Sequence, residues 1–296
     1  MRVGVSLRSR YEPPDVRTGA RWMVEQASVA WSAGLDSLFV GDHHVTGGPY
    51  YQNVPMLGRL LAEWEGRTAG ALFLLPLWNP VLVAEQVGTL ASLAGGRFVL
   101  QAAVGDGEGQ FAALGADLGG RAATFESSLA VIRTLLAGGE AGGARIGPLP
   151  PEPVDVWIGG TARRAIDRAA RLGDAWLAGP ELVVPRAAEL VSYYLDRCAT
   201  HSRLPAAVAV RRDVHIGQDT ADAQRVARPI LDRGYRGFDP DAVVVGGPDE
   251  VAEQFRALAA VGFTDVIVRP LSDDQADTLA CLDRLGQVRA SLHAAP

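Results

Sequence analysis

Apolar residues gather into short, nearly continuous runs along this chain, and the segments that precede several of these runs are amphipathic. In the segment 81–94, Leu82, Val83, Val87 and Leu90 recur at the spacing of one helix face. The runs themselves suit strands that are buried on both faces. Four stretches share this order of helical segment, glycine and apolar run: WSAGLDSLFV (31–40), SLAGGRFVL (92–100), RLGDAWLA (171–178) and AVGFTDVIV (260–268).

The glycine of each stretch stands where the helical segment ends. A residue at this place often adopts a left-handed conformation with positive φ, which glycine tolerates better than any other residue. We therefore expect positive φ at four positions, Gly34, Gly95, Gly173 and Gly262.

Repetition of a helix and a buried strand predicts a parallel sheet covered by helices. Eight such units favour one domain over residues 1–296, a (β/α)8 TIM barrel with insertion loops at its C-terminal face. An open, doubly wound sheet is the alternative. The segment 138–153 is expected to be a long loop, and 242–246 an extra short strand. The eight strands are expected near residues 3–7, 36–41, 69–75, 97–104, 154–159, 174–178, 207–215 and 264–269.

Composition and charge narrow the class of protein. The net charge of -6 gives no indication of nucleic acid or an anionic membrane as a partner, and no apolar run approaches the roughly 18 residues of a membrane span. All 28 basic residues are arginine, which excludes Schiff-base chemistry and a lysine-type phosphate loop. Cys198 and Cys281 are far apart, so neither a disulfide framework nor a zinc knuckle is expected, and the expected location is a reducing cytoplasm.

Active sites of (β/α)8 barrels form where the strands end, and the second predicted strand ends in Asp42, His43 and His44. Adjacent strand residues point to opposite faces, so the two histidines are poorly placed to bind one metal ion. We expect His43 to face the site with Asp42 beside it, and His44 to point away into the loop or the outer layer. Asp106 follows the fourth strand between two glycines, where it is either a turn residue or a proton donor or substrate anchor.

A second candidate site lies where the fifth strand leads into a helix. Backbone N–H groups at a helix start, helped by Arg163 or Arg164, are suited to bind a phosphate. A similar turn at 246–249 carries acidic residues and favours a plain helix cap. No GxGxxG motif follows a strand, which disfavours a dinucleotide-binding fold. The turn after the fifth strand consists of Gly159, Gly160 and Thr161.

Together these motifs resemble the luciferase-like monooxygenase family, a superfamily of flavin- and deazaflavin-dependent (β/α)8 oxidoreductases. The resemblance covers nearly the whole chain, and it depends on the order and spacing of the motifs. The segments are AGLDSLFVGDHHVTGGPY (33–50), LPLWNPVLVAEQVGTLASLAGGRFVL (75–100), GDGEGQFAALG (105–115), RAATFESSLAVIRTLL (121–136), VWIGGTARRAIDRAARLGDAWL (156–177) and VGGPDEVAEQFRALAAVGFTDVIVRP (245–270).

The resemblance implies roles for several of these residues. It places His43 near the reactive ring of the cofactor, with Asp42 in contact with the cofactor. It places Asn79 beside the cofactor, before a proline. Asp106 stands where deazaflavin dehydrogenases have an acidic catalytic residue, and the turn 159–161 matches the one that holds the cofactor phosphate.

Two further comparisons with the family follow from the resemblance. Many members have a non-proline cis peptide bond in the third strand under the ring, and its counterpart here is near Ala71 and Leu72. Related sugar-phosphate dehydrogenases have an aromatic residue where this chain has residues 46–47, and they bind phosphates with lysines. This chain has neither feature, so a sugar phosphate is not the expected substrate. Arg163, Arg164 and Arg269 are the residues available to replace the lysines.

We therefore expect a flavin- or deazaflavin-dependent oxidoreductase that acts on a small organic substrate. Coenzyme F420 is slightly preferred to FMN, with which the reaction would be a monooxygenation. Two alternatives stay open, a cofactor-binding protein without turnover and a metal-dependent hydrolase that uses His43, His44 and Asp42. A homodimer is expected, and the apolar segment 53–64 is either its interface or packs on the barrel.

Overall fold

Parallel strands form the framework of the molecule, and the computed structural model describes residues 1–294 of the chain. The strands are β1 (Arg2–Leu7), β2 (Ser37–Val40), β3 (Thr68–Leu74), β4 (Phe98–Ala103), β5 (Asp155–Gly159), β6 (Ala175–Ala178), β7 (Ala207–Ile216), β8 (Val244–Gly246) and β9 (Asp265–Pro270). Their order in the sheet is β6-β5-β4-β3-β2-β1-β9-β7-β8, and β6 also pairs with β7. Eight strands therefore close into a ring, while β8 pairs with the far end of β7. The predicted (β/α)8 barrel and its extra short strand are confirmed.

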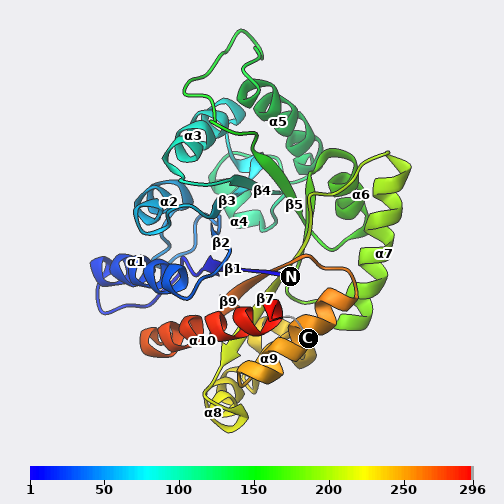
Figure 1. The fold of residues 1–296 in the computed structure, drawn as a ribbon. Helices are drawn as coiled ribbons and strands as arrows, with labels where there is room; N and C mark the ends of the chain where they lie inside the picture. Colours follow the sequence, from blue (N-terminus) through cyan, green and yellow to red (C-terminus); the bar gives the residue numbers. More distant parts are fainter. Residues whose placement is uncertain (295–296) are drawn as a thin grey trace. The chain divides into compact units, whose positions relative to one another are not determined.

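Helices alternate with these strands along the chain (Figure 1). Most strands are connected to the next by at least one helix, as parallel pairing requires. The α-helices of the described residues are α1 (Val16–Ser32), α2 (Asn53–Leu60), α3 (Pro80–Leu93), α4 (Glu108–Ala113), α5 (Arg121–Leu136), α6 (Arg163–Leu172), α7 (Val184–Thr200), α8 (Thr220–Leu231), α9 (Pro248–Ala260) and α10 (Gln275–His293).

The glycines that end the helices fall into two kinds. Gly34 and Gly262 have φ of 82° and 108°, as predicted. The prediction of positive φ is wrong for Gly95 and Gly173, and the latter has φ −89°. At these two positions space excludes a side chain, because a Cβ atom would lie 2.9 Å from the backbone nitrogen of Gly66 and 2.8 Å from the carbonyl oxygen of Ala169, respectively.

The described chain divides into two compact units, which we describe separately. The first unit contains residues 1–8, 21–38 and the chain from Ile158 onward, and the second contains residues 9–20 and 39–157. The prediction of one domain over the whole chain stays a prediction.

The first unit is built on three neighbouring strands, β1, β9 and β7. Val3 pairs with Val266 and Val210 also pairs with Val266, so β9 lies between the other two. All three valines are fully buried, as expected for strands covered on both faces. α9 and α10 lie side by side outside these strands (Figure 1).

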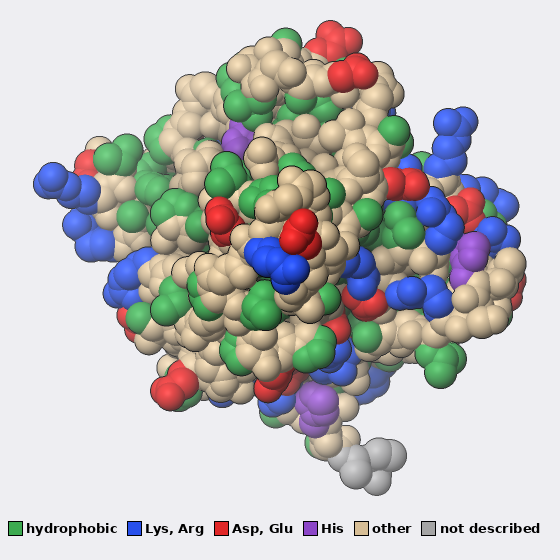
Figure 2. Space-filling model, turned by 90° about the horizontal axis from the view of Figure 1, so that it is seen from above, with side chains coloured by type: hydrophobic (Ala, Val, Ile, Leu, Met, Phe, Trp, Pro, Cys, Tyr) green, Lys and Arg blue, Asp and Glu red, His purple; other side chains and the backbone are tan. Residues whose placement is uncertain are grey.

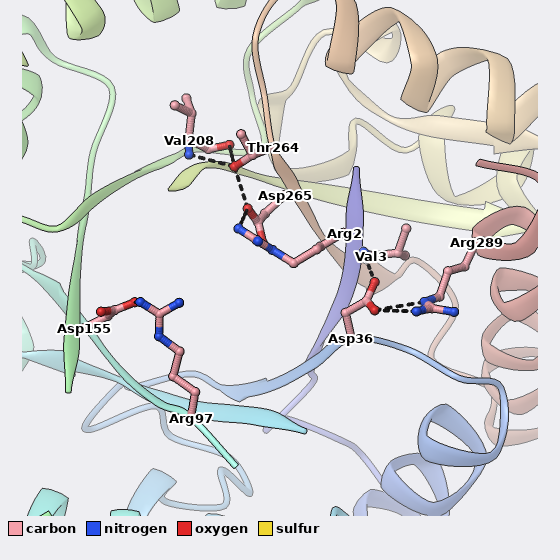
Figure 3. A network of polar contacts seen from close by, with 9 residues as sticks. All are labelled: Arg2, Val3, Asp36, Arg97, Asp155, Val208, Thr264, Asp265 and Arg289. Atoms are coloured by element: carbon pink, nitrogen blue, oxygen red, sulfur yellow. Dashed lines mark hydrogen bonds and ion pairs between the residues drawn. The ribbon is translucent and has the colours of Figure 1, made fainter. Parts of the chain in front are cut away.

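The second unit is built on β3 and β4, which pair in register from Ala69 opposite Phe98 to Leu74 opposite Ala103. α3 packs against α5 in the same unit. A Cβ atom at Gly70 would lie 2.9 Å from the ring of Phe39, so the ring can pack here only because residue 70 has no side chain. In the same unit, Arg97 and Asp155 form an ion pair (Figure 3).

Charged side chains connect the starts of the strands in the first unit (Figure 3). The guanidinium of Arg2 donates to both oxygens of Asp265 at 2.7 Å, and the hydroxyl of Thr264 donates to the same carboxylate at 2.6 Å. Asp36 accepts the backbone N–H of Val3 at 2.7 Å and the guanidinium of Arg289 at 2.6 Å. These contacts at the N-terminal ends of the strands, of which that between Arg2 and Asp265 is bidentate, suit a role in stability, since barrel active sites form at the other end.

Arginine and acidic side chains are interspersed over much of the face shown in Figure 2, with apolar side chains in small groups among them. The whole chain has a net charge of -6. No helix of the described residues is long and apolar enough to cross a membrane.

Candidate functional site

Asp42 is the centre of a hydrogen-bonded group at the end of β2, in the second unit. Its side chain is fully buried. One carboxylate oxygen, Oδ2, accepts the backbone N–H of Leu74 and the indole N–H of Trp78, each at 2.8 Å. Leu74 ends β3, and a short 3₁₀ turn, 75–77, precedes Trp78, so Asp42 fixes the chain that leaves β3. Its predicted contact with a cofactor stays a prediction.

His44 packs against this group. Its Nε2 lies 3.2 Å from Oδ1 of Asp42, and its ring centroid lies 5.5 Å from that of Trp78. Hydrogen bonding and charge attraction from Asp42 raise the pKa of His44 above its usual 6.5, although burial acts in the opposite direction. The prediction that His44 points away is therefore wrong. Residues two apart on an extended chain share a face, and this rule places His44 with Asp42.

His43 has a different environment from its neighbour, as the alternation along a strand predicts. The residue is exposed, and its ring centroid lies 6.1 Å from that of Tyr50. Its backbone carbonyl oxygen accepts the side-chain N–H of Gln52 at 3.3 Å. The imidazole of His43 is thus held near an aromatic ring and is accessible to a ligand.

The loop after β4 presents Asp106 between two glycines in left-handed conformations. Gly105 has φ 70° and Gly107 has φ 87°, and a side chain is strained at either position. The Asp106 side chain is exposed, so its carboxylate is accessible. This geometry permits both the turn role and the catalytic role that the sequence left open.

Gln110 connects this loop to the end of β2. Its Oε1 accepts the backbone N–H of His44 at 3.3 Å, and its Nε2 donates to the backbone carbonyl of Asp106. The residue is 5% exposed and lies on α4. Sequence reasoning missed Gln110, and the available signal was a single glutamine directly before the apolar Phe111 in a glycine-rich segment.

Asn79 caps α3. Its Oδ1 accepts the backbone N–H groups of Val81 at 2.9 Å and Leu82 at 3.4 Å, a usual role for asparagine at this position. The side-chain oxygen is therefore occupied, and the predicted cofactor contact would have to use the amide N–H groups. That contact stays a prediction.

The third strand does not contain the cis peptide bond expected near Ala71 and Leu72. Among residues 1–294 the cis peptide bond is that between Gly147 and Pro148. The expectation is wrong, and trans bonds here avoid the cost of a non-proline cis peptide bond. β3 pairs with β4 in continuous register through both residues. Ala71 is buried, and the carbonyl oxygen of Leu72 accepts the side-chain N–H of Asn53 at 2.7 Å.

The predicted phosphate turn lies in the first unit. Gly160 has φ 139°, and its carbonyl oxygen accepts the indole N–H of Trp176 at 2.7 Å. α6 then begins at Arg163, and no side chain caps its N-terminus. Its first N–H groups are therefore available to an anion, with Gly159 and Thr161 adjacent in the chain.

The side chains of Arg163 and Arg164 do not converge on one anion-binding position. The guanidinium of Arg163 lies over the ring of Tyr193, 4.6 Å from its centroid, which is a cation–π contact. Arg164 is exposed. An anion at the start of α6 would thus be held chiefly by backbone N–H groups.

Two buried side-chain donors of the second unit are suited to hydrogen-bond a flavin-type ring. The side-chain donors Gln101 Nε2 on β4 and Trp157 Nε1 on β5 are buried and have no hydrogen-bond partner within residues 1–294. Buried donors usually find an acceptor. The carbonyl groups of a flavin or deazaflavin ring are acceptors of the required kind, so these residues fit such a group.

A separate cluster of buried charge lies in the first unit. Asp213 is 1% exposed and accepts from Arg211 at 3.1 Å, from Arg236 at 3.1 Å and from the hydroxyl of Tyr235 at 2.8 Å. Burial alone would raise the pKa of Asp213, but the surrounding cations and the hydroxyl bring it below its usual 3.8. Arg269 lies opposite Asp213 in the pairing of β7 with β9, and burial next to other arginines lowers the pKa of Arg269 to about 10.

A metal site was one of the open alternatives for the histidine pair. No group of three or more histidine, cysteine, aspartate or glutamate side chains within the described chain is placed to hold a metal ion. His44 and Asp42 pair with each other instead.

Comparisons with known proteins identify relatives of this chain in sequence and in fold. The chain is 28% identical to the F420-dependent glucose-6-phosphate dehydrogenase of Beutenbergia cavernae, over 95% of this chain and 96% of that protein. A solved F420-dependent secondary alcohol dehydrogenase with an F420-acetone adduct shares the fold at TM-score 0.78 and 16% identity, over 99% of each chain.

The oxygenating constituent of 3,6-diketocamphane monooxygenase from Pseudomonas putida, solved with FMN, also has this fold. Its TM-score is 0.81 at 18% identity, over 100% of each chain. The family model for luciferase-like monooxygenases matches residues 1–242, which is most of the chain. The predicted family is thus confirmed, and the protein belongs to the luciferase-like monooxygenase family.

Proposed function

We propose that this protein is an oxidoreductase that uses coenzyme F420 and acts on a small organic substrate. The observation that carries the proposal is the connection made by Gln110 between the loop of His43 and the loop of Asp106. The loops that carry an accessible imidazole and an accessible carboxylate are thereby joined within one unit of the protein. The dehydrogenase of Beutenbergia cavernae, named as F420-dependent, supports the choice of cofactor.

The residues of the second unit have distinct tasks in this proposal. When bound, the deazaflavin accepts or donates a hydride, and the protein supplies orientation and proton transfer. The carboxylate of Asp106 takes the proton of a substrate hydroxyl during oxidation and returns it during reduction. The imidazole of His43 makes a hydrogen bond to the reacting oxygen. Asp42 and His44 hold the end of β2 from which His43 extends.

A phosphate of the cofactor has a suitable place in the first unit. The N-terminus of α6 has no side-chain cap, so the backbone N–H groups of Arg163 and Arg164 are free of the usual internal acceptor. The hydroxyl of Thr161 is adjacent to them in the chain. We propose that these groups, with Gly159 and Gly160, bind a cofactor phosphate.

The second candidate is an FMN-dependent monooxygenase. The FMN complex of a protein with the same fold favours it. In this case bound FMN would supply the chemistry with molecular oxygen, and the imidazole of His43 would hold or move a proton beside it. Asp106 would not be needed as the base of an alcohol oxidation. The residues at the site are the same, so the identity of the cofactor decides between the two functions.

Titration with oxidised coenzyme F420, FMN and reduced FMN, followed by absorbance and fluorescence, tests the proposal. We expect saturable binding of coenzyme F420, and His43→Ala should weaken it. Asp106→Asn should leave binding within about threefold and abolish turnover of an oxidisable alcohol panel. His293→Ala, an exposed histidine on α10, is the matched control. Binding of none of the three cofactors would overturn the proposal.

We also propose a cytoplasmic homodimer. Part of the segment 53–64 already packs within its own chain, since Leu57, Leu60 and Trp64 are 0% exposed. Met56 is only partly buried and lies on the same helix. Sedimentation velocity tests the dimer, and Met56→Glu should shift the protein toward the monomer if this helix forms the interface.

A further inference from the structure

The side chain of Gln110 uses both ends of its amide at once. Oε1 accepts the backbone N–H of His44 at 3.3 Å, while Nε2 donates to the backbone carbonyl of Asp106. A backbone N–H can only donate and a carbonyl can only accept, so the two partners fix the orientation of the amide. The amide of glutamine provides the one donor and the one acceptor that these two partners require.

The two partners are the backbones of two different loops. His44 follows β2 and is 66 residues from Gln110 in the chain, while Asp106 lies four residues before it. His43 is the residue directly before His44. The bonds of Gln110 therefore act on the backbone next to His43 and on the backbone of Asp106 itself, without using either side chain.

Gln110 is held firmly by burial, whereas the two loops that it bonds lie at the surface. Gln110 is buried at 5% exposure, and its neighbour Phe111 is 1% exposed, so α4 is anchored. The loops that it holds are exposed, and Val45, directly after His44, has a left-handed backbone with φ 54°. An anchored side chain that bonds two exposed loops is placed to decide their separation.

We infer that Gln110 is a positioning residue, which sets the distance between the loop of His43 and the loop of Asp106 by bonding both backbones. This inference rests on the proposed function for its consequence, because the separation matters only if both loops serve one ligand. Gln110 itself does not touch the ligand in this account, and it acts through His43 and Asp106.

Two substitutions separate the two bonds. Gln110→Met has nearly the same length and offers neither a strong donor nor a strong acceptor. Gln110→Glu keeps an acceptor for the N–H of His44 but loses the donor for the carbonyl of Asp106. Gln254→Met is the matched control, since Gln254 also lies on a helix and donates from Nε2 to a backbone carbonyl, that of Val245 at 3.5 Å.

The first measurement is amide hydrogen exchange at single-residue resolution on the full chain without cofactor. In Gln110→Met the His44 amide should exchange at least about tenfold faster than in the wild type, because its acceptor is lost. In Gln110→Glu the His44 amide should stay protected, while amides in residues 105–108 exchange faster. Unchanged exchange at both loops in Gln110→Met would overturn the inference.

The second measurement is the titration with oxidised coenzyme F420 and with FMN, together with the midpoint of thermal unfolding. Gln110→Met should bind the cofactor at least about tenfold more weakly, with Gln110→Glu between it and the wild type, at unfolding midpoints close to the wild type. Faster exchange with unchanged affinity would overturn the positioning role while the proposed function stands. If the wild-type protein binds neither cofactor, the proposed function is overturned, and the positioning role with it. The hydrogen-exchange measurement would still show whether Gln110 joins the two loops.

Discussion

Trp78 donates its indole N–H to Oδ2 of Asp42 at 2.8 Å, although the two residues are 36 positions apart in the chain. The same oxygen accepts the backbone N–H of Leu74. One buried carboxylate thus holds the segment after β2 to the segment after β3. The stability of the site therefore depends on Asp42.

Asp42→Ala should destabilise the protein by about 3 kcal/mol or more, because two buried N–H groups lose their acceptor. Asp42→Asn keeps one acceptor oxygen and should cost less than half as much. Urea unfolding followed by circular dichroism gives both values. Equal losses for the two variants would show that the negative charge, rather than the acceptor, is what matters.

The pair of His44 and Asp42 predicts a pH dependence of stability. The pKa of His44 is raised above 6.5 in the folded protein, so the protonated form contributes stability that is full below pH 6.5. This contribution should disappear as the pH rises through the raised pKa. His44→Phe keeps a ring beside Trp78 but cannot be protonated, so the excess stability of the wild type over this variant should fall with rising pH. Urea unfolding from pH 5.5 to 8.5 measures this, and a difference independent of pH would contradict it.

Substitution of Asp213, in the first unit, should lower the free energy of unfolding strongly. Asp213→Asn removes the negative charge among Arg211, Arg236 and Arg269, and should cost about 3 to 5 kcal/mol, as for other broken buried ion pairs. The pKa of Asp213 is lowered, so its contribution is full above pH 3.8 and is lost as the pH falls through the lowered pKa.

The control for Asp213 is a carboxylate at the surface. Asp222 pairs with Arg225 at 2.8 Å on the exposed side of α8. Asp222→Asn should lower the free energy of unfolding much less than Asp213→Asn does, because solvent screens the surface pair. Guanidinium chloride would screen these charges, so urea is the suitable denaturant. A similar cost for both substitutions would contradict the importance of burial at Asp213.

Val45 predicts a substitution that stabilises the protein. This exposed, β-branched residue has φ 54°, a conformation that costs an L-residue roughly 1 to 2 kcal/mol. Val45→Gly should therefore raise the free energy of unfolding by about 0.5 to 1 kcal/mol, after the entropy cost of glycine is counted. Val45→Ala keeps most of the steric cost and serves as the control. A loss of stability in the glycine variant would show that the valine side chain makes a contact of its own.

The pattern of the sequence was sufficient for the sheet. Predicted strands at 69–75 and 264–269 correspond to Thr68–Leu74 and Asp265–Pro270. Continuous apolar runs are diagnostic here because a parallel strand is buried on both faces. The helix-ending glycines show the limit of such rules, since Gly34 has the predicted left-handed backbone and Gly173 has none. The position of a glycine in the sequence does not show why glycine is needed there. At Gly34 the backbone has positive φ, whereas at Gly173 there is no room for a side chain.

The site was predictable only in part. The sequence by itself determined that Asp42, His43 and Asp106 follow buried strands of a barrel, because strand ends are visible in the local order of apolar and polar residues. Only the tertiary structure decided that His44 pairs with Asp42 and that Gln110 joins two loops. These contacts join segments up to 66 residues apart and depend on side-chain positions of a few tenths of an ångström, and no pattern along one chain contains such distances.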